Sequence, residues 1–117
     1  MRVLAEDKGE QDFCFYRGIS NTVGNLWETR NTPSDQWHPV DLTNWACTFE
    51  MYLPGEYTPV YSRACDAHGI DGKAATYIPA DAFTDNVWAT RKTGTWRTIA
   101  KNGNIVELLG SGYWHLD

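Results

Sequence analysis

The side chains that come closest to a reactive pair are Cys65 and His68, which stand three positions apart. A thiol beside an imidazole can act as an activated nucleophile, and the Cys-x-x-His spacing could supply half of a zinc site. The second half of such a site is missing. Gly69 and Gly72 also place His68 in a turn, where an imidazole is usually solvated. We therefore expect neither role for this pair.

Other catalytic and ligand-binding patterns are absent from the sequence. No serine stands in a Gly-x-Ser-x-Gly elbow, and no glycine-rich run opens a helix to hold phosphate. Asp66 and Asp71 flank one turn without the spacing of a calcium loop, and His38 and His115 lie far apart. The sequence does not exclude a carboxylate pair for glycoside hydrolysis, because such a pair comes together only in the folded chain. The sequence predicts a protein that is not an enzyme and holds no metal or cofactor.

Aromatic residues are better candidates for a functional site than these patterns, because the chain has six Trp and six Tyr. Trp27 and Trp37 fall in the segment 20–39, which reads as the longest loop, and loops this long are often functional. We take both as candidate interface residues, with the alternative that they pin the loop to the core. Exposed Trp rings could also stack on sugars, so a carbohydrate-binding module is the alternative function. The remaining four lie in or beside predicted strands and suit a core: Trp45, Trp88, Trp96 and Trp114.

Residues 45–53 form the clearest predicted strand. Their apolar side chains alternate with others in a period of two, which is typical of a strand with one face in a core. The buried face is predicted to carry Trp45, Cys47, Phe49 and Met51.

The rest of the chain reads as further short strands separated by turns. Asn102-Gly103 is the strongest signal for a two-residue hairpin, residues 79–83 suit a single helical turn, and residues 1–11 fray or form an edge strand. Seven or eight strands with so little helix predict an all-β fold, an immunoglobulin-like antiparallel β-sandwich, as one domain over residues 1–117. The other predicted strands cover residues 12–19, 60–65, 73–78, 95–101, 104–109 and 113–116.

Charge and hydropathy exclude several partners. The net charge of −5, with scattered basic residues, disfavours nucleic acid and anionic membrane surfaces. No segment has 18 consecutive apolar residues, and residues 1–10 lack the apolar stretch of a secretory signal. We expect the protein to be made and folded in the cytoplasm.

The three cysteines, Cys14, Cys47 and Cys65, each lie in an apolar or strand-like run. An odd number does not suggest a closed disulfide framework. Three free thiols in the core are expected, and one disulfide with a spare thiol is the alternative.

Several short motifs occur in an order that resembles the immunoglobulin-like domains of bacteriophage tail and baseplate proteins, including the N-terminal domains of baseplate and receptor-binding proteins. They are FYRG at 15–18, DLTNW at 41–45, GKA at 72–74 and VELLGSGYWHL at 106–116. The resemblance covers residues 10–117 and implies no catalytic residues. It implies a structural or assembly module that docks to other phage tail or virion proteins or to copies of itself. Such a protein would be present in the host cytoplasm during assembly and then in the virion.

Overall fold

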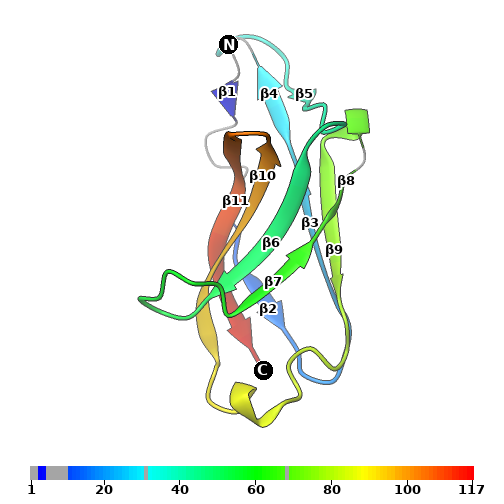
Figure 1. The fold of residues 1–117 in the computed structure, drawn as a ribbon. Helices are drawn as coiled ribbons and strands as arrows, with labels where there is room; N and C mark the ends of the chain where they lie inside the picture. Colours follow the sequence, from blue (N-terminus) through cyan, green and yellow to red (C-terminus); the bar gives the residue numbers. More distant parts are fainter. Residues whose placement is uncertain (1–2, 5–10, 31, 68) are drawn as a thin grey trace.

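The computed structural model describes residues 3–4, 11–30, 32–67 and 69–117. Within this part the chain forms eleven strands and two short 3-10 helices (Figure 1). The strands are β1 (Val3–Leu4), β2 (Phe13–Phe15), β3 (Asn21–Leu26), β4 (Glu28–Arg30), β5 (His38–Pro39), β6 (Ala46–Tyr52), β7 (Tyr61–Ala64), β8 (Asp66–Ala67), β9 (Lys73–Ile78), β10 (Thr93–Asn102) and β11 (Ile105–Leu116), and the helices are η1 (Gly69–Asp71) and η2 (Asn86–Trp88).

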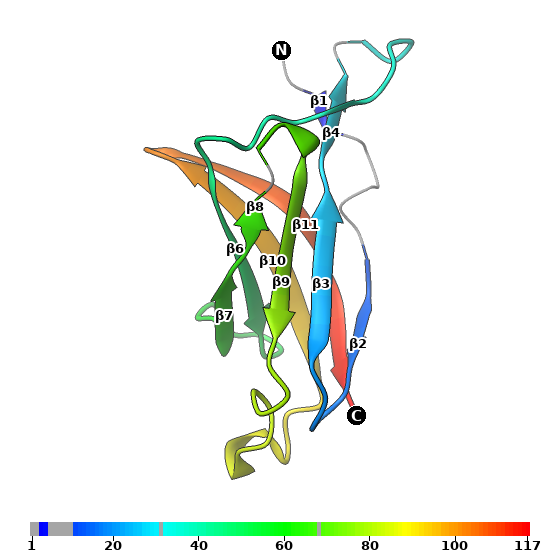
Figure 2. The same ribbon diagram turned by 90° about the vertical axis from the view of Figure 1, so that its right-hand side faces the viewer.

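Two sheets face each other and make an immunoglobulin-like β-sandwich, as predicted (Figure 2). One sheet has five strands in the order β2-β11-β10-β6-β7, and the other has three in the order β3-β9-β8. In immunoglobulin terms β11, β10, β6 and β7 occupy the positions of strands G, F, C and C′, and β3, β9 and β8 those of B, E and D. A small sheet of β1, β4 and β5 extends one end. The sandwich has eight strands, which agrees in number with the prediction, but β3 and β8 were not predicted and the segments predicted at 104–109 and 113–116 form the single strand β11.

The interior is divided into two clusters, which we call the lower and upper cores after their positions in Figure 1. The lower core lies toward the C-terminus and is dominated by aromatic rings. The upper core lies toward the opposite end and contains smaller side chains. The lower core consists of Phe15, Val23, Phe49, Met51, Ile78, Phe83, Trp88, Trp96, Trp114 and Leu116, and the upper core of Trp27, Val40, Leu42, Cys47, Ala74, Ala100 and Leu109.

The motif Gly-x-Trp occurs once on β10 and once on β11, and the two copies pack against each other. Gly94 lies opposite Trp114, and Trp96 lies opposite Gly112. Each indole covers the glycine of the neighbouring strand. The Trp96 Nε1 donates a hydrogen bond of 2.7 Å to the carbonyl of Gln11, and the Trp114 Nε1 donates one of 3.0 Å to that of Tyr52. The paired motifs thereby fix β2 and β6 on either side of the central hairpin.

The predicted strand at 45–53 is confirmed as β6, with Cys47, Phe49 and Met51 buried. Trp45 precedes the strand and is only half-buried against the upper core. The hairpin is also confirmed, but its turn is Gly103-Asn104, because Asn102 pairs with Ile105. Gly103 has φ +60°, which suits the first central position of a type II′ turn.

The loop predicted over residues 20–39 is wrong, because β3, β4 and β5 all fall within it. Asn and Gly in β3 suggest a turn, yet Val23 faces the core and the whole strand pairs with β9. Tertiary pairing overrides local preference here. The first strand, predicted over 12–19, ends already at Phe15. The segment 79–83, expected as a single helical turn, is a hydrogen-bonded turn in which the Ala82 N–H donates to the Pro79 carbonyl at 3.0 Å, and a 3-10 helix follows at η2.

The turn-rich segment below the sandwich is fixed by one arginine of the FYRG motif. The Arg17 guanidinium donates to the carbonyl oxygens of Trp88 at 2.9 Å and Arg91 at 3.2 Å. Trp88 is buried against the ring of Phe83, with 4.8 Å between ring centroids.

The expected fraying or edge strand at residues 1–11 is described only at β1 and Gln11, and residues 1–2 and 5–10 lie outside the described part.

Candidate interaction surface

Trp27, the first candidate interface residue, lies in the upper core with 5% of its surface exposed. Its backbone N–H donates to the carbonyl of Gly72 at 2.7 Å, and its carbonyl accepts from Val40 at 2.9 Å. A Cβ at Gly72 would collide with that same Trp27 carbonyl, so the segments pack backbone to backbone. Trp27 therefore pins its segment to the core and presents no contact surface.

Trp37, the second candidate, is half-buried at the end formed by β4 and β5. The Arg30 guanidinium lies over its ring at 4.2 Å from the centroid. This cation–π contact occupies one face of the indole. The structure does not bring Trp27 and Trp37 together on one surface.

The carbohydrate alternative depended on exposed Trp rings, and the structure has none. All six tryptophans lie in the described part of the chain, and each is buried or half-buried. Trp88, Trp96 and Trp114 fill the lower core, as their strand positions predicted.

The three cysteines are free thiols, and two of them are inside. Burial raises the pKa of the Cys47 thiol, and burial with the neighbouring Cys47 raises that of Cys65 to about 12. A thiol with such a pKa is protonated at neutral pH and is a poor nucleophile. Cys14 is exposed, which corrects the expectation of three core thiols, because the inward residues of β2 are Phe13 and Phe15.

The half zinc site or nucleophile considered in the sequence was the pair of Cys65 and His68. His68 lies outside the described residues. Among the described residues no three His, Cys, Asp or Glu side chains gather as metal ligands. No helix in this part is long and apolar enough to cross a membrane.

Exposed apolar side chains concentrate on β11, which sequence reasoning did not single out. Ile105, Val106, Leu108 and Tyr113 are each exposed over half or more of their surface. Ile105 and Val106 stand at the tip of the β10–β11 hairpin, which extends beyond the other strands in Figure 2. The period of two along β11, with Trp114 and Leu116 inside, would have placed Tyr113 outside.

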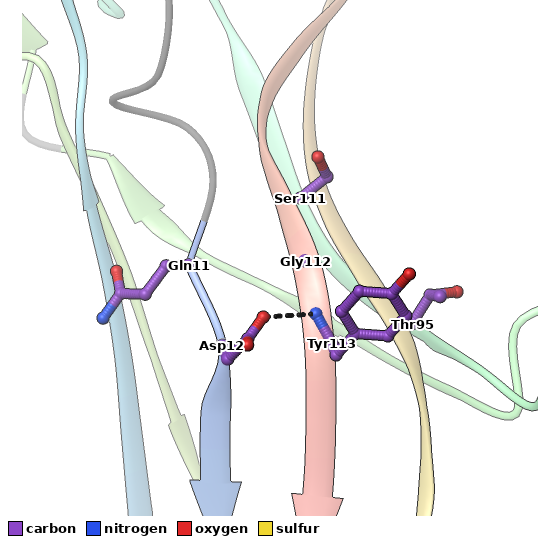
Figure 3. A pocket seen from close by; sticks show the side chains of 6 residues that line it. All are labelled: Gln11, Asp12, Thr95, Ser111, Gly112 and Tyr113. Atoms are coloured by element: carbon purple, nitrogen blue, oxygen red, sulfur yellow. Dashed lines mark hydrogen bonds between the residues drawn. The ribbon is translucent and has the colours of Figure 1, made fainter.

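Below the hairpin tip, the sheet surface has an open depression of about 580 Å³ (Figure 3). Its lining is polar and aromatic: Gln11, Asp12, Thr95, Ser111, Gly112 and Tyr113. The Asp12 carboxylate accepts a hydrogen bond of 3.1 Å from the Tyr113 backbone N–H, which joins the chain before β2 to β11.

A second depression of about 250 Å³ adjoins the first at Thr95. Tyr52, Glu56, Tyr57 and Arg97 complete its lining, and Tyr57 is 96% exposed.

A polar network orders the side chains at the second depression. The Arg97 Nε donates to Glu50 Oε1 at 2.7 Å, the Tyr52 hydroxyl donates to the same oxygen at 3.0 Å, and the guanidinium lies 5.4 Å from the Tyr52 ring centroid. The bond to Glu50 raises the pKa of Arg97, and partial burial together with that carboxylate raises the pKa of the Tyr52 hydroxyl. Arg97 is therefore a fixed cation, and Tyr52 stays neutral.

We call the outward side of the five-stranded sheet the outer face, and define it by Tyr52, Thr95, Arg97, Leu108 and Tyr113. It combines rigid tyrosines, an arginine, hydroxyl groups and aliphatic side chains on an open surface. This composition is typical of protein interfaces, where Tyr and Arg are enriched.

No protein-family model matches the chain, and no curated protein matches it. Among solved structures, the N-terminal four Ig domains of Dscam1 isoform 4.44 align over 98% of this chain with 11% identity and a TM-score of 0.45. Those of isoform 7.44 align over 98% with 8% identity and a TM-score of 0.45. The chain spans about a quarter of the length of each, 24%.

Proposed function

We propose that the chain is a non-enzymatic binding module that docks to another protein through its outer face. The observation that carries this is the set of exposed apolar and aromatic side chains that β11 presents on this face, Val106, Leu108 and Tyr113. Exposed apolar groups that cluster on one element favour an interaction site. Sandwiches of immunoglobulin-like build commonly serve as interaction modules, which agrees with this assignment.

The geometry of the outer face supports docking to a protein surface. Both depressions open to one side of the sheet and share Thr95, so a partner could cover them together. Tyr52 and Arg97 are already held by Glu50, which lowers the entropy lost on binding. Tyr113, which lies opposite Thr95 and lines the first depression, is the natural anchor.

We further propose that the partner is a structural protein of a bacteriophage tail or baseplate. This rests on the order of the short motifs at 15–18, 41–45, 72–74 and 106–116. In this proposal the chain is made in the host cytoplasm, assembles there with tail proteins or with copies of itself, and remains in the virion. Tail genes on either side of its coding sequence would support this context, and unrelated neighbours would count against it.

The test is site-specific photocrosslinking in cells that make the native particle. A photoreactive phenylalanine replaces Tyr113 on the outer face, and Tyr77 on the opposite sheet as a matched control. Tyr77 is 65% exposed and lies on β9, so both positions are accessible tyrosines in strands. We expect an adduct with a tail protein from position 113 only.

Binding of the purified partner then gives the size of the effect. Tyr113→Ala should weaken binding about 30-fold or more, since a central aromatic anchor contributes about 2 kcal/mol. Tyr77→Ala should leave the Kd within about threefold. Equal effects of the two variants, or adducts from position 77 alone, would contradict docking through the outer face. Adducts only between copies of the chain would make it a self-assembling module.

A further inference from the structure

Two of the three cysteines lie side by side on neighbouring strands. Thr48 of β6 pairs with Ala64 of β7 in antiparallel register, so Cys47 and Cys65 are the next opposite pair. The Cys65 backbone N–H donates to the Cys47 carbonyl at 2.9 Å, which continues the pairing by one residue beyond the end of β7. The Cα atoms of opposite residues in antiparallel strands lie about 4.5–5.5 Å apart, within the range of about 4.4–6.8 Å that a disulfide spans.

Both side chains point to the same side of the sheet, because both pack against the upper core. Cys47 belongs to the upper core, and Cys65 packs against the same cluster. Cys47 and Cys65 also line one open depression of about 470 Å³, whose rim includes Leu42, Trp45 and Ala64. A small reagent can therefore approach the more exposed Cys65 through this depression, with the buried Cys47 next to it.

We propose that Cys47 and Cys65 are a dithiol pair that closes to a disulfide on exposure to a disulfide oxidant such as oxidised glutathione, with Cys14 left free. This proposal does not depend on the proposed docking function. The bond would join β6 to the point where the chain leaves β7 and crosses to β8 in the other sheet.

The reaction balances as two thiol–disulfide exchanges. The thiolate of the more exposed Cys65 attacks oxidised glutathione, forms a mixed disulfide and releases one glutathione thiolate. The Cys47 thiolate then attacks the Cys65 sulfur, forms the protein disulfide and releases the second glutathione. The protein loses two protons and two electrons, and the oxidant is reduced to two thiols. Because both thiols are protonated at neutral pH, the rate should rise with pH.

The test uses the full chain, reduced and then incubated at pH 8.5 with oxidised glutathione, either folded or during refolding from urea. Free thiols are alkylated, and tryptic peptides are mapped without reductant. Arg17, Arg30, Arg63 and Lys73 place each cysteine on its own peptide. We expect most molecules to contain the peptide of Cys47 linked to that of Cys65, with Cys14 alkylated. We also expect a urea midpoint about 1–2 M above that of the reduced chain.

Variants separate the pair from the exposed thiol. Cys14→Ser should still form the link, whereas Cys65→Ala, which keeps a small apolar side chain, should abolish it. Two outcomes would overturn the proposal. In the first, all three cysteines are alkylated in both the folded and the refolded sample. In the second, every disulfide that forms includes Cys14. If Cys65→Ala fails to fold, peptide mapping of Cys14→Ser still decides the outcome.

Discussion

The lower and upper cores are built from the same two sheets, yet they differ in what fills them. Six of the ten residues of the lower core are Phe or Trp, whereas the upper core has one aromatic residue, Trp27, beside Ala and Cys. Aromatic side chains bury the largest apolar areas, so the lower core should contribute more to stability. The cysteine pair lies at the upper core, whereas Tyr113, the proposed docking anchor, lies beside Trp114 and opposite Thr95 on the strands that cover the lower core. The docking anchor thus stands on the aromatic half of the sandwich, and the redox pair on the half with smaller side chains.

The largest effect should follow from emptying the lower core. Phe49 is fully buried and contacts the rings of Phe13, Phe15 and Trp96. Phe49→Ala should reduce the free energy of unfolding by about 3–5 kcal/mol, because it leaves a cavity among rigid rings. Urea denaturation followed by Trp fluorescence measures the loss, and a value under about 1 kcal/mol would refute burial.

Adding one methyl group at the paired Gly-x-Trp motifs should have the next largest effect. In Gly112→Ala the new Cβ would collide with the Gln11 carbonyl oxygen and lie 2.9 Å from the Trp96 Nε1. We expect a loss of about 3 kcal/mol, since a backbone must move to relieve the contact. Gly24→Ala on β3 is the control: its Cβ would meet only the Ala75 Cβ at 4.0 Å, so stability should change by less than about 1 kcal/mol. Similar losses of stability in both variants would show that the close packing around Gly112 is not the cause of the loss.

A cavity in the upper core should cost less than one in the lower core. Leu42 is buried but lines the open depression beside the cysteine pair, where neighbouring side chains can move inward. Leu42→Ala should therefore cost about 2 kcal/mol, the low end for such a change. A loss as large as that of Phe49→Ala in the same denaturation assay would remove the distinction between the two cores.

The smallest expected effect is a loss of stability at alkaline pH. It should arise at the upper core, because this core contains Cys47 and adjoins Cys65. The pKa of Cys65 is raised from 9.0 to about 12, so the folded state retains the proton while the unfolded state loses it. Stability from this group is present below pH 9 and falls as the pH rises from 9 toward 12, by about 1 kcal/mol at pH 10. Cys65→Ala should show a shallower decline in urea titrations between pH 8 and 10, and an unchanged slope would contradict the assignment.

Strands with a clear period of two could be predicted from the sequence. The segments that became β6, β9 and β10 were predicted nearly to their ends, because side chains such as Phe49 and Ile78 mark one buried face, whereas the single strand β11 was predicted as two, 104–109 and 113–116. β3 was missed, since Asn21 and Gly24 favour turns and only the partner strand β9 makes them extended.

The candidate surface was harder to predict than the fold. Trp27 and Trp37 were selected by residue type within a supposed loop, but a residue type does not tell which side of a sheet a ring faces. Tyr113 could have been placed outward from its neighbour Trp114. The depressions beside it depend on Asp12 and Tyr57, which only the folded chain brings to the same face. The cysteine pair likewise depends on the register of β6 and β7.

The reciprocal contact of Gly94 with Trp114 and of Trp96 with Gly112 also limits how this hairpin can diverge between relatives. A larger residue at either glycine would collide with a backbone carbonyl, that of Tyr52 at Gly94 and that of Gln11 at Gly112, so a smaller opposite side chain would not make room and both positions should stay glycine. Beyond the pairs, toward Gly103, no such restriction acts, and insertions there would leave both indoles in place. The part of the hairpin with the two Gly-x-Trp motifs should therefore tolerate little change, whereas its tip should tolerate insertions. The tip at Gly103-Asn104 is the position at which foreign peptide segments can be displayed.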